Sequence, residues 1–256
     1  MKNHSTLFRV FTGRQADGNR ATVHLVDNLP DDLSHNIASL LRDIENTAVY
    51  IKPLIEGYEY DICWFNPKGR IQRCGHGTLA AAAFLQQTYK QSAYLFHSVT
   101  ESLKVEVLKN SYSLKLPIEK LIEKKDFVFN SKRAAQTNNE EGYLIVELNS
   151  EEQVKDFRLS PKIIKNIKQR ALIITAQSGN NDIVFRYFAP QYDIEEDSAT
   201  GSAASVLWPF WIESLSDSSQ KNNILCYQAS REGGSFEIKK IDHELSIIGN
   251  VTPVHK

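Results

Sequence analysis

The feature that most constrains the fold of this chain is a glycine-rich turn that runs directly into an alanine-rich segment. Residues 74–78 read Cys-Gly-His-Gly-Thr, and residues 79–85 read Leu-Ala-Ala-Ala-Ala-Phe-Leu. Small and apolar residues on every face predict a helix that begins at about residue 75 and is buried all round. Because the first N–H groups of a helix lack intrahelical acceptors, the turn also outlines an anion site beside His76.

A second stretch of the same kind follows in the other half of the chain. Residues 200–211 read Thr-Gly-Ser-Ala-Ala-Ser-Val-Leu-Trp-Pro-Phe-Trp, and Gly201 lies 126 residues after Gly75 in a chain of 256. Upstream, each turn follows an Asp-Ile pair and a Phe-x-Pro triplet. Downstream, segments 102–116 and 235–248 each read as two alternating strands around a polar turn. We interpret the chain as two structural repeats, each with a central buried helix.

Pro209 interrupts the second predicted helix. Proline has no N–H to donate to the carbonyl of Ser205, so we expect a kink or a water-filled gap at this point.

The two stretches divide the chain into an N-terminal lobe over residues 1–117 and a C-terminal lobe over residues 118–256. The lysine-rich residues 119–137 keep no sustained apolar period and are interpreted as the crossing between the lobes, and the last strand is expected to return to the first lobe. Around the two turns, the pattern predicts strands at 7–11, 21–26, 47–51, 143–148, 172–175 and 183–188, and helices that begin at 29–30 and 160–161.

Composition limits the function classes. A formal net charge of −1, with 41% hydrophobic and 24% charged residues, gives no reason to expect nucleic acid or an anionic membrane as a partner. No segment approaches the ~18 consecutive apolar residues of a spanning helix, and the N-terminus does not read as a signal sequence. The three cysteines lack metal-type spacing, so we expect a cytoplasmic protein without a bound metal.

Further motifs accompany the two turns along the chain. They are Gly18-Asn19, the Arg-Tyr-Phe-Ala-Pro run at 186–190, Glu196-Asp197 before the second turn, and Gln228, Arg231 and Gly233 near the end. With the turn at 74–80, these motifs cover almost the whole chain. In these residues the chain resembles the PhzF-like isomerases of phenazine biosynthesis, which share the diaminopimelate epimerase fold.

The resemblance implies an α+β fold of two pseudo-repeated lobes, each a curved, mostly antiparallel sheet wrapped around a central buried helix. Both helix N-termini would face a cleft between the lobes. Since each end carries roughly half a positive charge, a small carboxylate is the expected substrate or ligand. The implied reaction needs no cofactor, and exposed strand edges make a homodimer plausible.

The mechanism implied by the resemblance is a proton shift in which a glutamate takes a proton from one substrate carbon and returns it to another. A histidine and an aspartate, matching His76 and Asp197, hold the substrate and assist. Family members read Ser-Glu-Thr-Ala where this chain reads Glu45-Asn46-Thr47-Ala48, so Asn46 takes the place of the glutamate. An amide cannot accept and return a proton near neutral pH. Either Glu45 reaches the site by a local shift, or the chemistry differs, or catalysis has been lost; we expect Asn46 to face the cleft.

Substrate contacts are expected from both turns and from the first loop. The residues are Gly75, Gly77, Thr78, Thr200, Gly201, Ser202, Gly18 and Asn19. Simpler roles compete with this one. His76 could bond only to its own turn, and Ser202 could only cap the second helix. Arg186 and Arg231 are interpreted as structural ion-pair partners and not as catalysts.

Cysteine chemistry offers a rival mechanism. Epimerases and racemases of this fold use one thiol from each lobe, and Cys74 lies at one such position. No thiol stands near residues 198–200, and Cys226 lies in a predicted strand beyond the turn. A two-thiol racemase is therefore disfavoured, and Cys74 is interpreted as a buried wall residue that would be reactive only if it faced the cleft.

Two hypotheses of different class follow. In the first, the chain is an isomerase or epimerase of a small carboxylated metabolite, with His76, Asp197 and either Glu45 or Asn46 at the site. In the second, it is a catalytically silent relative that binds a small acid or a protein partner, because Asn46 stands where the family has its catalytic glutamate.

Overall fold

The computed structural model describes residues 5–30, 47–66, 69–125, 131–164, 167–179, 182–192, 194–215, 222–241 and 244–254. The chain divides into two compact units. Unit 1 comprises Met1–Lys115 and Ile248–Lys256, and unit 2 comprises Leu116–Ile247. The chain therefore passes from one unit to the other at residues 115–116 and again at 247–248.

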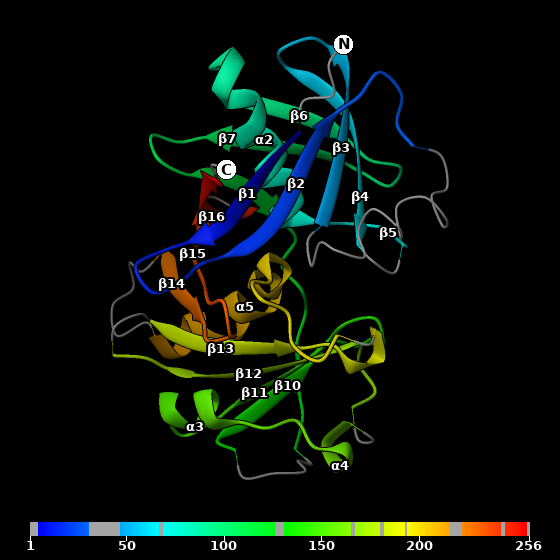
Figure 1. Cartoon of the computed structure of the whole chain (residues 1–256). Helices are drawn as coiled ribbons and strands as arrows, with labels where there is room; N and C mark the ends of the chain where they lie inside the picture. The colour runs from blue at the N-terminus through cyan, green and yellow to red at the C-terminus, as the bar shows by residue number, and fades with distance from the viewer. Residues whose placement is uncertain are drawn as a thin grey trace. The chain divides into compact units, whose positions relative to one another are not determined.

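Unit 1 is a sheet with one long helix (Figure 1). Its strands pair in the order β1-β2-β3-β4-β6-β7-β8, and β16 also pairs with β1. The elements are β1 (Ser5–Thr12), β2 (Asn19–Leu25), β3 (Thr47–Ile55), β4 (Glu59–Asn66), β5 (Gly69–Ile71), α2 (Gly75–Tyr89), β6 (Ala93–His97), β7 (Ser102–Val107), β8 (Tyr112–Leu116) and β16 (Glu244–Pro253), which belongs to unit 1 from Ile248 onward.

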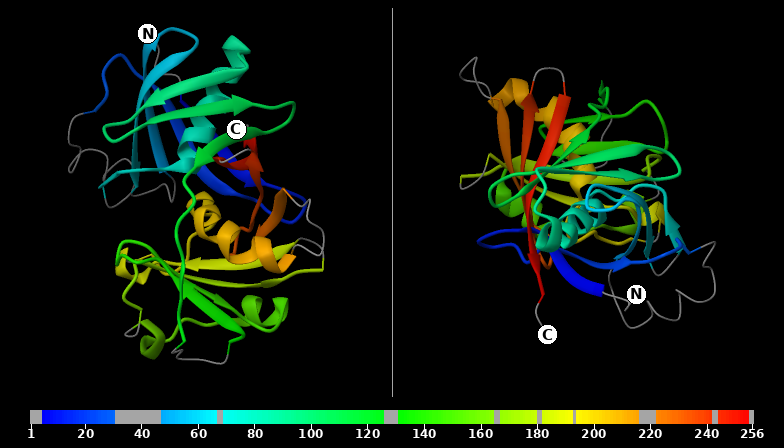
Figure 2. Two further views of the ribbon diagram at one scale, coloured as in Figure 1. Left: turned by 180° about the vertical axis from the view of Figure 1, so that it is seen from behind. Right: turned by 90° about the horizontal axis from the view of Figure 1, so that it is seen from above.

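Helix α2 confirms the prediction of a buried helix that begins at residue 75. Residues Gly77–Ala83 and Leu85 are all buried, because β1, β2 and β3 lie along the helix (Figures 1 and 2). The helix ends after Tyr89, where Lys90 adopts a left-handed conformation with φ 53°. A left-handed residue is a common helix stop, because its N–H can reach back to the last free carbonyls.

Unit 2 contains the remaining strands, in the order β15-β14-β13-β12-β11-β10-β9. The elements are β9 (Ile122–Glu123), β10 (Arg133–Gln136), β11 (Tyr143–Glu147), α3 (Glu151–Asp156), α4 (Pro161–Ile164), β12 (Ala171–Gln177), β13 (Ile183–Phe188), the 3₁₀ turns η1 (Pro190–Tyr192) and η2 (Gly201–Ala203), α5 (Ala204–Leu215), β14 (Asn223–Gln228) and β15 (Gly234–Ile241).

The central strand β12 is buried on both faces. Leu172 and Ile174 belong to the apolar cluster that also contains Val154 of α3, while Thr175 accepts a hydrogen bond from Trp211 of α5 at 3.2 Å. Helices α3 and α5 lie on opposite sides of the sheet, as Figures 1 and 2 show. Alternate side chains of a strand point to opposite faces, so a strand covered on both faces becomes a continuous apolar run.

The two units share an order of strand pairings. From β1 to β7 the pairings are antiparallel, parallel, antiparallel, parallel and antiparallel. The same alternation runs from β10 to β15. Helix α2 connects the parallel strands β4 and β6, and α5 connects the parallel strands β13 and β14. The pairing order supports an internal repeat with one helix in each unit.

The second helix opens with the 3₁₀ turn η2, which was not predicted. The residue before that turn, Thr200, makes no capping hydrogen bond with its side chain. Ser202 lies inside η2, and its carbonyl accepts a hydrogen bond from the Ser205 hydroxyl at 2.8 Å.

The carbonyl freed by Pro209 is occupied. The backbone N–H of Glu119 donates to the carbonyl of Ser205 at 3.0 Å, and α5 continues through Pro209 to Leu215. A backbone donor therefore takes the place expected for water. The lysine-rich residues 119–137 include β9 and β10 of unit 2, so the expectation that they form only a crossing is corrected.

Two predicted elements extend outside the described residues. The helix expected from 29–30 enters residues 31–46, and the polar turn expected between the two strands of segment 235–248 falls at residues 242–243.

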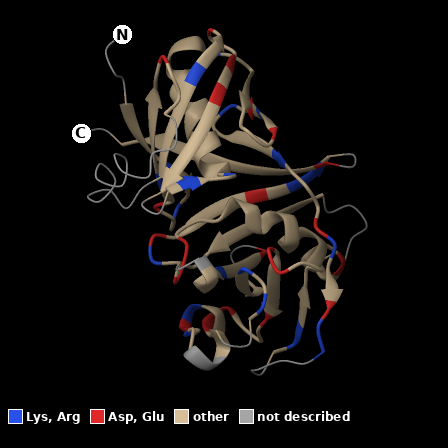
Figure 3. Cartoon of the chain, turned by 90° about the vertical axis from the view of Figure 1, so that its right-hand side faces the viewer, with Lys and Arg blue, Asp and Glu red and all other residues tan. Residues whose placement is uncertain are grey.

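Charges of both signs are interspersed along the face drawn in Figure 3. Among the described residues, no helix combines the length and the apolar character needed to cross a membrane.

Candidate active site

In unit 1, the turn before α2 is fixed by a cysteine cap. Cys74 is extended, with φ −140° and ψ 96°, and its sulfur accepts a hydrogen bond from the Gly77 N–H at 3.4 Å. The Cys74 carbonyl accepts from both the N–H and the hydroxyl of Thr78, at 3.0 and 2.8 Å. The Gly77 N–H, which has no partner within the helix, is thereby capped, and the Thr78 N–H makes the first regular bond of the helix.

His76 lies between a hydroxyl and a thiol. Its Nε2 is 3.1 Å from Oγ1 of Thr47, the first residue of β3, and its Nδ1 is 3.5 Å from Sγ of Cys74. The side chain is half-buried. The strand and the helix cap thus hold an imidazole, which can gain or lose a proton near neutral pH, in a defined orientation. His76 is bonded beyond its own turn, because Thr47 belongs to another element.

The two glycines of this turn differ in the space available for a side chain. A Cβ on Gly77 would lie 2.8 Å from Cδ1 of Trp64 and 3.0 Å from Cγ2 of Val49. A Cβ on Gly75 would meet only Cδ2 of Leu114, at 3.6 Å. Packing therefore requires glycine at residue 77 and leaves room for a methyl group at residue 75.

Gly18 directly precedes β2, and Asn19 is the first residue of that strand. Gly18 has φ +75°, and a Cβ there would lie 2.3 Å from the Val10 carbonyl oxygen. Asn19 pairs with Val10 in the sheet. The backbone conformation and close approach explain why glycine stands at this place.

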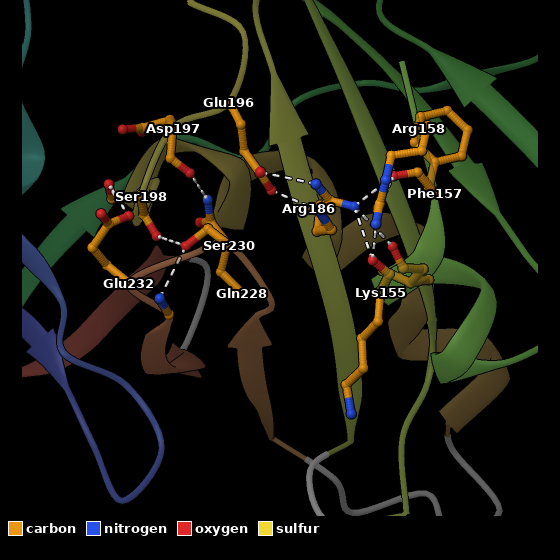
Figure 4. Close-up of polar contacts among 12 residues, drawn as sticks. Lys155, Phe157, Arg158, Arg186, Glu196, Asp197, Ser198, Gln228, Ser230 and Glu232 are labelled. Atoms are coloured by element: carbon orange, nitrogen blue, oxygen red, sulfur yellow. Dashed lines mark hydrogen bonds and ion pairs between the residues drawn. The ribbon is translucent and has the colours of Figure 1, made fainter. Parts of the chain in front are cut away.

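In unit 2, Asp197 is held at its backbone and at its side chain (Figure 4). Its N–H donates to the Tyr187 carbonyl at 3.1 Å, and its carbonyl accepts from Nε2 of Gln228 at 2.5 Å. The Thr200 hydroxyl donates to its carboxylate, and the Thr200 N–H donates to Oε1 of Gln228 at 2.7 Å. Gln228 is fully buried, so one amide side chain ties both ends of this loop to β14.

A second loop completes this cluster. The Ser198 hydroxyl donates to Glu232 at 2.9 Å, and the Ser230 hydroxyl donates to the Ser198 carbonyl at 2.5 Å (Figure 4). The Gly233 N–H in turn donates to the Ser230 hydroxyl at 3.0 Å. Sequence reasoning missed Ser230 and Glu232. The polar run with two glycines at residues 230–234 is a turn signal that could have pointed to them.

Arg186 has the structural role predicted from the sequence. Its guanidinium pairs with Glu196, with Nε 2.6 Å from Oε1 and Nη2 2.8 Å from Oε2.

Comparison with known proteins shows the family of this chain. The profile of the phenazine biosynthesis-like protein family, PhzC-PhzF, matches residues 8–119 and 105–255, which together span nearly the whole chain. The chain belongs to this family. An uncharacterised isomerase of Vibrio cholerae is 31% identical to it over 242 residues, which cover 91% of this chain and 82% of that protein.

Solved structures agree with this membership. A PhzC/PhzF protein from Clostridium difficile has 26% identity and a TM-score of 0.86, covering 99% of this chain and 97% of that chain. A hydroxyproline epimerase from Agrobacterium vitis, solved with bound trans-4-hydroxy-L-proline, has a TM-score of 0.58 at 8% identity, covering 98% of this chain and 91% of that one. The PhzF-like chain therefore has the α+β fold of these epimerases and isomerases.

The position that the resemblance assigns to the catalytic glutamate falls outside the described residues of this PhzF-like chain. Glu45 and Asn46 belong to residues 31–46, and Thr47, which contacts His76, follows directly in the sequence.

The other cysteines of the PhzF-like chain are poor nucleophiles. Burial raises the pKa of the Cys63 thiol to about 11 and raises the pKa of the Cys226 thiol well above its ordinary value. Both groups therefore stay protonated at neutral pH. Within the described part of the chain, no three His, Cys, Asp or Glu side chains gather in a way that could hold a metal ion.

Proposed function

We propose that this protein is a PhzF-like isomerase or epimerase that catalyses a cofactor-free proton shift on a small carboxylated metabolite. The observation that carries the proposal is the placement of His76, with its ring nitrogens 3.1 Å from the Thr47 hydroxyl and 3.5 Å from the Cys74 thiol at the start of a buried helix. Membership of the isomerase-containing family supports it.

His76 is suited to exchange a proton with substrate. Its ring nitrogens lie beside the Thr47 hydroxyl and the Cys74 thiol, which orient the imidazole, and a positioned imidazole is the commonest general acid–base group. The positive end of the α2 dipole favours a substrate carboxylate at the same turn.

Asp197 is the second proposed catalytic group. The Thr200 hydroxyl donates to its carboxylate and so orients a group whose oxygens could accept a proton or a substrate N–H or O–H. General acid–base transfer by a positioned group of this kind contributes about 10²–10⁴-fold. Thr200, Gly201 and Ser202 remain proposed substrate contacts beside it.

The identity of the proton-carrying base is part of the proposal. The resemblance assigns the glutamate position to Asn46, whose amide cannot transfer a proton, so the proposed activity depends on His76 or Asp197, with Glu45 as the competing candidate. The hydroxyproline epimerase has an amino acid bound, and this supports a carboxylated substrate class for the shared fold.

A two-step experiment tests the proposal. Small carboxylates are first screened by thermal shift, and the acids that stabilise the protein are then incubated with it in heavy water and followed by NMR. We expect at least one acid to stabilise the protein and to gain deuterium at carbon. Stabilisation without deuterium gain would instead support the catalytically silent binder.

The base is identified by two variants measured in the same assay. We expect Asn46→Glu to increase deuterium gain and Glu45→Gln to leave it unchanged. Loss of exchange in Glu45→Gln would assign the proton transfer to Glu45 and contradict the proposed role of Asn46.

A further inference from the structure

The Arg186 guanidinium makes contacts through all three of its nitrogens. Nε and Nη2 bind the Glu196 carboxylate at 2.6 and 2.8 Å, and Nη1 donates to the Phe157 carbonyl at 2.7 Å and the Lys155 carbonyl at 3.1 Å (Figure 4). The side chain is only 11% exposed. A buried guanidinium is stable only when its charge and donors are matched, and a bidentate carboxylate with carbonyl acceptors meets that requirement.

One side of this contact set is a rigid support. Arg186 lies on β13, and its ring neighbour Phe188 belongs to the apolar cluster that also contains Val154 of α3. The carbonyls of Val154, Lys155 and Phe157 are at the C-terminal end of α3, where a cation is favoured by the dipole and by unpaired acceptors. The contacts with β13 and α3 therefore hold the guanidinium in place independently of Glu196.

The other side is the loop that carries Asp197. Glu196 precedes Asp197 directly, and the Asp197 N–H donates to the carbonyl of Tyr187, the residue after Arg186. The Arg186 side chain and the Tyr187 backbone thus hold consecutive residues of the loop. The Gln228 side chain also donates to the backbone carbonyl of Asp197.

We propose that Arg186 is a positioning residue that, through Glu196, sets the location of the Asp197 carboxylate for the proton shift. This inference rests on the proposed function only for the catalytic consequence, because the anchoring of Asp197 can be measured without activity. Misplacing a catalytic group by about 1 Å can cost about 100-fold in rate, so an anchor one residue away is placed to affect the chemical step.

The same unit offers a matched control pair. Arg133 binds Glu147 with Nε 2.6 Å from Oε2, and Glu147 is nearly buried. Arg133 also packs over the ring of Phe210 at 4.1 Å. This pair joins β10 to β11, and Arg133 also donates to Ser214 of α5, so its described partners lie on other elements than the Asp197 loop. Equal substitutions there test for general loss of stability.

The first measurement is hydrogen exchange of the Asp197 amide. We call the two-bond contact between the Arg186 guanidinium and the Glu196 carboxylate the fork. Glu196→Gln and Arg186→Lys each break the fork but leave a side chain of similar length. Exchange of the Asp197 N–H is expected to become at least about 10-fold faster relative to the amides of β12, whereas Glu147→Gln and Arg133→Lys leave this ratio unchanged. An unchanged ratio in the two fork variants would overturn the proposal, whether or not the protein is an enzyme.

The second measurement separates kcat from KM for any acid that the protein isomerises. Both fork variants are expected to lower kcat about 10- to 100-fold with KM changed less than about 2-fold, and both control variants are expected to keep kcat. A rise in KM alone would contradict positioning for the chemical step. If the wild type isomerises no acid while the exchange ratio responds as expected, the anchoring of Asp197 stands and the proposed function fails.

Discussion

At the scale of single residues, the two glycines of the turn before α2 should differ in how much a methyl group destabilises the protein. Gly77→Ala would bring a Cβ within 2.8 Å of Trp64. We expect it to lower the free energy of unfolding by about 1–3 kcal/mol, the usual cost of overpacking a tight core. Gly75→Ala has room for its methyl group, so its effect on stability should stay below about 1 kcal/mol. Urea unfolding of both variants checks this, and equal losses would show that the turn is not packed as described.

His24 gives the stability of the protein a predictable pH dependence. Its ring stacks on Tyr50 with centroids 4.8 Å apart, and burial lowers its pKa from the ordinary value of 6.5. The unfolded chain therefore takes up a proton first as the pH falls below 6.5, and the folded state loses stability there while stability above that pH is unaffected. Compared with wild type, His24→Gln should lose less stability between about pH 7.5 and 5.5. If urea titrations showed that wild type and His24→Gln lose the same free energy of unfolding between the two pH values, His24 would not be the origin of this pH dependence.

At the scale of elements, the interior proline of α5 depends on a partner outside the helix. Glu119→Pro removes the N–H that binds the Ser205 carbonyl, which leaves a buried acceptor unpaired and should cost about 1–3 kcal/mol. In a Pro209→Ala background, the new helical N–H can take over that carbonyl, so the same substitution should cost at least about 0.5 kcal/mol less. A double-mutant cycle from urea unfolding measures the difference. Equal costs in both backgrounds would show that the two donors do not share the carbonyl.

The elements also show which structure is readable from sequence. The alanine-rich run after Cys74 predicts α2 correctly, because a helix buried on every face needs small and apolar residues at every position. Local patterns also place β13 and the β7–β8 hairpin. The opening 3₁₀ turn of α5 and the partner of the Ser205 carbonyl were not predicted. Glu119 is far from Ser205 along the chain, and a contact at that separation leaves no periodic signal.

At the scale of the whole molecule, the family and the α+β fold were predicted from ordered motifs, and the comparisons confirm both. The residues that support the candidate site were harder to foresee. Gln228 was noted only as a motif residue, yet its buried amide ties Asp197 to Thr200. Glu232 and Ser230 carried no signal stronger than that of a polar turn. Side-chain anchors of this kind depend on which loops the sheet brings together, and local sequence does not specify that.

The measurement that tests the central claim most directly is deuterium incorporation from heavy water into an acid that binds the wild type. Purified wild type, His76→Asn and Asp197→Asn are compared by NMR, with Arg133→Lys as the matched control. The account predicts that wild type and Arg133→Lys label the acid at carbon at the same rate, and that His76→Asn and Asp197→Asn are each slowed by at least about 100-fold. Labelling at the wild-type rate in both site variants, or no labelling of any bound acid by wild type, would contradict it.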